Sequence, residues 1–157
     1  MKREIKFRGK RIDKDVFVFG DMLTGMGYKK GKFYILPHLT YYPGDCNDLG
    51  GYEVIPETIG QFTGLLDKNG KEIYEGDIIE IKEIGGYGCK RKGVVEYDVD
   101  GCAFVVRVLR PSWAGIARLS TRVQICADGN CTHEYINQYT VIGNIHDNPE
   151  LLKTETL

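Results

Sequence analysis

Residues 65–73 read LLDKNGKEI, and this stretch decides the fold because Asn-Gly stands between two short apolar runs. Asn-Gly tolerates the positive φ angles of tight hairpin turns at little steric cost, so we predict a turn at 67–70. Residues 76–82, GDIIEIK, then show the alternation of a strand, with Ile79 and Ile81 on one face. The stretch therefore predicts antiparallel β structure.

The chain on both sides of this stretch has the same pattern of strands and turns. A strand at 93–97, a turn at 98–101 and an apolar run at 103–109 make a meander of at least three strands, the minimum for independent stability. Residues 139–145 predict a closing strand. Further strands are expected at 4–8, 16–19, 33–36 and 52–55.

Three segments depart from this pattern. Residues 112–121 fit either a loop or a short helical turn, and this choice stays open. We expect a turn of helix within 132–138. Asp-Asn-Pro-Glu at 147–150 is a helix-start signal, because Pro suits the first helical position and Glu the positive end of the helix dipole. A helix of one or two turns should follow, through Leu152.

Composition limits the class of protein. The 157 residues include 20 glycines and five prolines, scattered so that long amphipathic helices are excluded almost everywhere. With 21 Lys+Arg against 22 Asp+Glu, the net charge is -1, so any binding to nucleic acid has to come from a local patch. We find no membrane-spanning run or signal peptide and expect a cytoplasmic protein, whose five cysteines are free thiols.

Short, twisted strands bury one face by curling over on themselves, with glycines at the corners. We therefore predict a single domain at 1–157 of the mainly β class, built on an SH3-like barrel. The barrel-like core covers 57–146, residues 1–56 add N-terminal strands and loops, and 147–157 form a short C-terminal helix and tail.

Four ordered blocks resemble the YopX-like phage and prophage protein family. They are REIKFR at 3–8, VIPETIGQFTGL at 54–65, DKNGKEIYEGDII at 67–79 and VIGNIHDNPELL at 141–152. The resemblance implies a mainly β protein with an SH3-like barrel, encoded in phage or prophage genomes and prone to self-assembly. It supplies no catalytic residues to carry over.

Cys126, Cys131 and His133 are the nearest approach to a metal site, because thiolate and imidazole are zinc ligands. A structural zinc site needs four ligands, and only three are local. The fourth would have to come from Cys89, Cys102 or His146. We favour ordinary thiols on a turn and expect no metal and no cofactor.

A glycine-rich basic loop at 85–93 is the candidate nucleic-acid site. Tyr87 could stack on a base, and Lys90, Arg91 and Lys92 could meet phosphates. The alternative is a solvated hairpin tip, whose cations discourage edge-to-edge pairing of strands.

Our first hypothesis is a non-enzymatic protein that self-assembles and binds a phage or host protein, through exposed strand edges and aromatic surface. The alternative is a nucleic-acid-binding module that uses the basic loop. We expect a homo-oligomer and no contact with a membrane.

Overall fold

The computed structural model describes residues 4–24, 31–37, 50–82, 90–109, 116–118, 122–127, 130–135 and 139–153. Within these ranges the protein is mainly β, with antiparallel pairing throughout. The chain divides into two compact units, 1–64 and 65–157, within what we predict as a single domain. No helix in the described ranges is long and apolar enough to cross a membrane.

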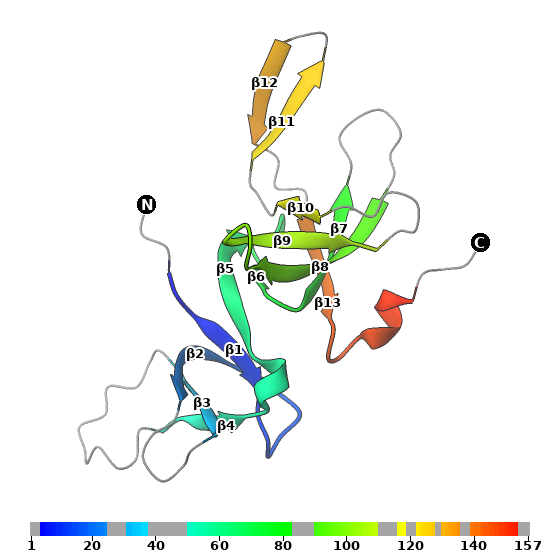
Figure 1. Ribbon diagram of the computed structural model, residues 1–157. Coiled ribbons are helices and arrows are strands. Elements are labelled where there is room, and N and C mark those ends of the chain that lie inside the picture. The colour runs from blue at the N-terminus through cyan, green and yellow to red at the C-terminus, as the bar shows by residue number, and fades with distance from the viewer. Residues whose placement is uncertain are drawn as a thin grey trace. The chain divides into compact units, whose positions relative to one another are not determined.

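The first unit is built around one sheet with the strand order β4-β3-β2-β1-β5 (Figure 1). Its elements are β1 (Phe7–Lys10), β2 (Phe17–Thr24), β3 (Phe33–Leu36), β4 (Tyr52–Val54), the 3-10 turn η1 (Pro56–Thr58) and β5 (Gly60–Leu66). The expected strands near 16–19, 33–36 and 52–55 are confirmed. The first expected strand begins three residues later than predicted.

β2 pairs with two neighbouring strands, and the change of partner falls at Gly20. Its residues up to Gly20 pair with β1, and those from Asp21 onward pair with β3. A Cβ atom on Gly20 would lie 1.7 Å from the carbonyl oxygen of Leu36, so only glycine allows this approach.

The outer edge of β4 is bonded to the chain that follows β1. Arg11 forms a bridge with Val54, Ile55 N donates to Lys10 O at 2.8 Å, and Ile12 N donates to Glu53 O at 3.2 Å. β4 therefore has backbone partners on both sides.

The second unit contains a five-stranded sheet with the order β10-β9-β8-β7-β13. Its strands are β7 (Asp77–Lys82), β8 (Lys90–Asp98), β9 (Ala103–Val108), β10 (Ile116–Arg118) and β13 (Tyr139–Asn144). A separate hairpin is formed by β11 (Arg122–Ala127) and β12 (Asn130–Tyr135), and β6 (Glu72–Tyr74) is the neighbour of β5. The predicted meander and closing strand are confirmed.

One apolar cluster holds the second unit together. Ile73, Ile79, Val95, Val106 and Tyr139 are buried in it, with Leu65, Ile81 and Val141 packed against them. These residues come from six strands, β5 to β9 and β13, and lie at every second position along β7 and β13. The prediction that Ile79 and Ile81 share a face is confirmed.

The predicted turn at 67–70 does more than reverse the chain. Gly70 has φ +80° and its N–H donates to Asp67 O at 3.0 Å, so glycine takes the left-handed position. Lys68 N donates to Tyr139 O at 3.0 Å, and Asp67 Oδ2 accepts from Val141 N at 3.1 Å. The turn thus bonds to the edge of β13 that faces away from β7.

The predicted closed barrel needs correction. The described strands form two antiparallel sheets and a hairpin rather than a closed barrel, because β5 pairs with β1 and β6 while β7 pairs with β8 and β13. The SH3-like barrel is not confirmed.

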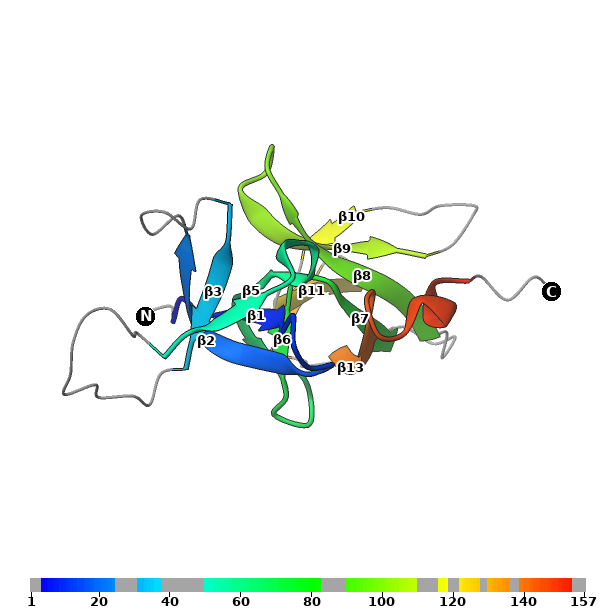
Figure 2. The ribbon, with the colours of Figure 1, turned by 90° about the horizontal axis from the view of Figure 1, so that it is seen from below.

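The expected turn of helix within 132–138 is wrong for residues 132–135, and residues 136–138 lie outside the described ranges. Residues 130–135 pair with β11 instead, since six cross-strand partners outweigh the weak local preference of so short a segment. In the open segment 112–121, residues 116–118 are strand β10. The C-terminal helix is one 3-10 turn, η2 (Pro149–Leu152), with Pro near its start as predicted; Figure 2 shows it in red after β13.

Candidate functional site

The predicted nucleic-acid residues lie on a strand rather than on a loop tip. β8 begins at Lys90, so Lys90, Arg91 and Lys92 all pair with β7. Their partners are Lys82, Ile81 and Glu80, respectively. Tyr87 and most of the loop lie outside the described residues.

Pairing separates the three cations onto two faces of the sheet. Arg91 lies opposite Ile81, on the face of the apolar cluster, and is half-buried. Lys90 and Lys92 occupy the other face, because successive residues of a strand alternate. Lys92 lies opposite a carboxylate, Glu80, so the three do not form one phosphate-binding row.

An ion pair lies on the same face of β8 and β9 as Lys92. Arg107 donates to both oxygens of Glu96, from Nε at 2.9 and 3.1 Å, with Nη2 2.8 Å from Oε2. The hydrogen bonds that Arg107 donates to Glu96 are the main cause that raises the pKa of Arg107. This exposed pair holds its two charges beside each other rather than presenting a lone cation.

An apolar surface lies on one face of the first unit's sheet. Phe19 is 46% exposed, Ile12 56% and Ile55 36%. Lys10 pairs with Phe17, two residues from Phe19 on β2, and the Arg11 bridge to Val54 sets Lys10 opposite Ile55. By this register Phe19, Ile12 and Ile55 share the face of Lys10, and we call these three residues the apolar face.

Two cations near the amino end, Lys6 and Arg8, pack on aromatic rings. The guanidinium of Arg8 lies 5.1 Å from the centre of the Phe17 ring, and Lys6 Nζ lies 5.2 Å from that of Phe62. Arg8 is only 7% exposed. Such stacking is favourable when the cation is desolvated, so these side chains contribute to the sheet itself. Sequence alternation alone does not reveal a buried arginine.

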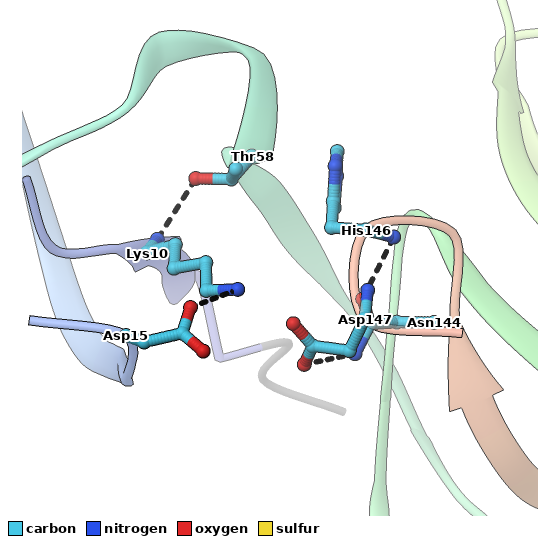
Figure 3. Close-up of polar contacts among 6 residues, drawn as sticks. All are labelled: Lys10, Asp15, Thr58, Asn144, His146 and Asp147. Atoms are coloured by element: carbon cyan, nitrogen blue, oxygen red, sulfur yellow. Dashed lines mark hydrogen bonds and ion pairs between the residues drawn. The ribbon is translucent and has the colours of Figure 1, made fainter. Parts of the chain in front are cut away.

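Lys10 is bonded within the first unit through its backbone and through its side chain (Figure 3). Its backbone N donates to Thr58 Oγ1 at 2.8 Å, and its Nζ pairs with Asp15. Arg11 pairs in the same way with Asp13, with Nε 2.7 Å from Oδ1, which raises the pKa of Arg11 and lowers that of Asp13. The cations near the amino end are therefore paired with nearby carboxylates.

The residues of the predicted metal site meet on the β11–β12 hairpin. Cys126 lies directly opposite Cys131, and His133 lies opposite Gln124. Positions 126, 131 and 133 therefore share one face. Where side chains are described, no group of three His, Cys, Asp or Glu residues could hold a metal ion. Cys102 is a free, exposed thiol in a turn.

The buried carboxylates of the second unit bind backbone N–H groups. Asp77 is 1% exposed and accepts from Tyr74 N at 2.8 Å. Asp67 is 2% exposed and accepts from Asn69, Lys71 and Val141 N at 2.7, 2.9 and 3.1 Å. Burial opposes ionisation of Asp67, but these donors outweigh it and lower its pKa. Both carboxylates hold turns, which is a structural role.

His146 has a similar local role within a turn after β13. Asn144 Oδ1 accepts from the backbone N of His146 and of Asp147, both at 2.9 Å, and Asn144 Nδ2 donates to Asp147 Oδ2 at 2.9 Å (Figure 3). This is an Asx-type turn, in which a side-chain oxygen replaces a backbone acceptor. The family block that ends in DNPELL is thus a turn and a 3-10 helix.

Fold and surface together define a class of protein: a two-unit, all-β chain whose buried carboxylates Asp67 and Asp77 serve turns and whose apolar and charged surfaces lie on sheet faces. A family model described as YopX protein matches residues 6–153, nearly the whole chain. The protein belongs to the YopX family.

Comparison with solved structures found protein EF1440 from Enterococcus faecalis, whose crystal structure is similar to this chain. The two are 22% identical, the match covers 97% of this chain and 100% of the other, and the TM-score is 0.44. A search of curated proteins found no match.

Proposed function

We propose that the protein acts without catalysis, by self-association and by binding a phage or host protein in the cytoplasm. The observation that supports this proposal is the apolar face, on which Phe19, Ile12 and Ile55 are each more than a third exposed. Large apolar side chains that gather on one surface are typical of interfaces between proteins.

We choose a face rather than the edges of β4 and β13 because those two edges are occupied. Residues 10–12 bond to the outer edge of β4, and the turn at 67–70 bonds to β13. An edge whose backbone groups already have partners is a poor template for another strand. These two sets of contacts, at the edge of β4 and at the edge of β13, are the reason to propose an SH3-like, barrel-related scaffold.

A second copy of the chain is the partner that the charges of this surface suit. The exposed Asp21 follows Phe19 by two residues on β2, and Lys10, whose Nζ pairs with Asp15, lies on the same face. In a two-fold interface each residue meets the partner's counterpart of another, so a surface that carries both signs can pair with itself.

Light scattering over a concentration series tests self-association. We expect the wild-type protein to be dimeric or larger at about 50 µM, which corresponds to micromolar affinity. Phe19→Ser should shift it toward monomer, since aromatic anchors dominate interface energies. Val99→Ser is the matched control, because Val99 is 76% exposed but lies in a turn of the second unit. A wild-type monomer throughout the series would refute self-association.

Nucleic-acid binding is the second candidate, and the register of the second sheet supports it in a new place. The face of β7 to β10 that is opposite the apolar cluster carries five cation positions, together with the carboxylates Glu80, Glu96 and Asp98 and the buried Ile78, Val94 and Val105. The cations are Lys82, Lys90, Lys92, Arg107 and Arg118.

Gel shifts with single- and double-stranded DNA across a salt series test this candidate. We expect Lys92→Glu to weaken binding and to lower the salt slope by about 1, as for the loss of one phosphate contact. Lys71→Glu is the matched control, since it makes the same charge change at an exposed turn residue. Absence of binding at low salt would refute the candidate.

A further inference from the structure

The β11–β12 hairpin sets two cysteines directly across from each other. Ala127 pairs with Asn130 at the end of the hairpin, so a two-residue connection, 128–129, joins the strands. The next pair along the strands is Cys126 with Cys131. Five cysteines occur in the chain, and the register brings these two together.

The type of pair suits a disulfide. In a hairpin with a two-residue connection, the residues that flank the connection form the hydrogen-bonded pair. Pair types alternate along an antiparallel ladder, so Cys126 and Cys131 occupy a non-hydrogen-bonded pair, whose Cα atoms are about 4.5 Å apart. Disulfides span Cα separations of roughly 4.4 to 6.8 Å. The backbone therefore places both residues within bonding range without a change of register.

We propose that Cys126 and Cys131 are a redox-active thiol pair, which a low-molecular-mass disulfide such as oxidised glutathione converts into a cross-strand disulfide. The thiolate of Cys126 attacks one sulfur of the oxidant, and one glutathione thiolate leaves. The thiolate of Cys131 then attacks the Cys126 sulfur of this mixed disulfide, and the second glutathione leaves. Two protons and two electrons pass from the pair to glutathione.

The disulfide would be a short-range crosslink near the end of the hairpin, so its formation and reduction would affect the stability of the hairpin alone. A disulfide between positions so close in sequence closes a small loop, which stabilises less than a long one. We therefore assign the pair to reversible thiol chemistry rather than to holding the fold. This fits the expected reducing compartment, where disulfides are transient.

Zinc binding is the competing use of the same face, because His133 shares it with the two cysteines. The hairpin supplies three of the four ligands of a closed tetrahedral site. A disulfide needs only Cys126 and Cys131, which the register already places opposite each other. Stoichiometric zinc in the purified protein, released on alkylation of Cys126, would overturn the proposal.

Mass spectrometry after incubation with a reduced and oxidised glutathione mixture gives a direct test. Trypsin cleaves after Arg122 and next after Lys153, so both cysteines lie in one peptide, while Cys46, Cys89 and Cys102 fall in three others. After alkylation of the remaining thiols, we expect this peptide to carry an internal disulfide, 2 Da below the dithiol mass. The native protein should form it at least about tenfold more readily than the denatured chain, since the register raises the effective concentration of one thiol at the other.

A variant that moves one thiol by a single residue is the matched control. Asn130→Cys with Cys131→Ser keeps two cysteines on the hairpin but transfers one to the opposite face, because a shift of one residue reverses the side of a strand. We expect this variant to lose the internal disulfide and to be glutathionylated at single cysteines. Equal disulfide yield in the variant, or a native peptide that remains a dithiol, would overturn the proposal.

Discussion

Asp67 links the 67–70 turn to β13 through one carboxylate, and its replacement should destabilise the second unit. In Asp67→Ala, the backbone N–H groups of Asn69, Lys71 and Val141 lose their acceptor. Each such loss costs about 1–3 kcal/mol when the group is buried. Asn69 and Lys71 are exposed turn residues that water can reach, so we expect a total near 2–4 kcal/mol.

Asp67→Asn removes the charge of the side chain but keeps its size and shape. The amide keeps one acceptor oxygen for the turn but presents a donor where Val141 N donates, so about 1–2 kcal/mol should be lost. Urea unfolding, followed by circular dichroism at neutral pH, measures both variants. Asp100→Asn, an exposed carboxylate in another turn, is the control and should change stability by less than about 0.5 kcal/mol.

The pH dependence gives an independent check. The pKa of Asp67 in the folded protein is lowered, so its stabilisation is complete above its unfolded pKa and is lost as pH falls through the lower, folded value. The difference in unfolding free energy between wild type and Asp67→Asn should therefore shrink on acidification below pH 3.8. A difference that stays constant between neutral and acid pH, or an Asp67→Ala variant as stable as the control, would refute this account.

Three further changes test the packing and the turns. Gly93→Ala should destabilise by about 1–3 kcal/mol in thermal or urea unfolding, because the new Cβ would lie 2.4 Å from Val106 Cγ1 and 3.0 Å from the oxygen of Arg107; unchanged stability would contradict the register of β8 and β9. Cys102→Gly should stabilise by roughly 0.5–1 kcal/mol, since Cys102 has φ +47° in its turn, and a destabilised variant would count against that backbone conformation. Glu96→Gln should lower stability only slightly, and less at high salt, because its pair with Arg107 is exposed and screened; a large, salt-independent loss of stability would contradict this.

Local patterns predicted the strands well because their rules act over a few residues. The alternation of Ile79 and Ile81 and the Gly70 turn are each settled by the pleat or by the φ angle of one residue. The prediction of a helical turn over residues 132–135 is wrong for the same reason, since the state of this segment depends on cross-strand partners in β11. Pairing with β7, not the run of cations itself, decides which face of the sheet each of residues 90–92 takes.

The amino-acid sequence by itself determined the β class, the family, most strand positions and the turn at 67–70, because each depends on neighbouring residues. Only the tertiary structure decided that Asp67 bonds to a strand more than 70 positions later, that Cys126 faces Cys131, and that Phe19, Ile12 and Ile55 share a surface. Those contacts are long-range or cross-strand, and their register follows from the packing of whole strands rather than from any one stretch of chain.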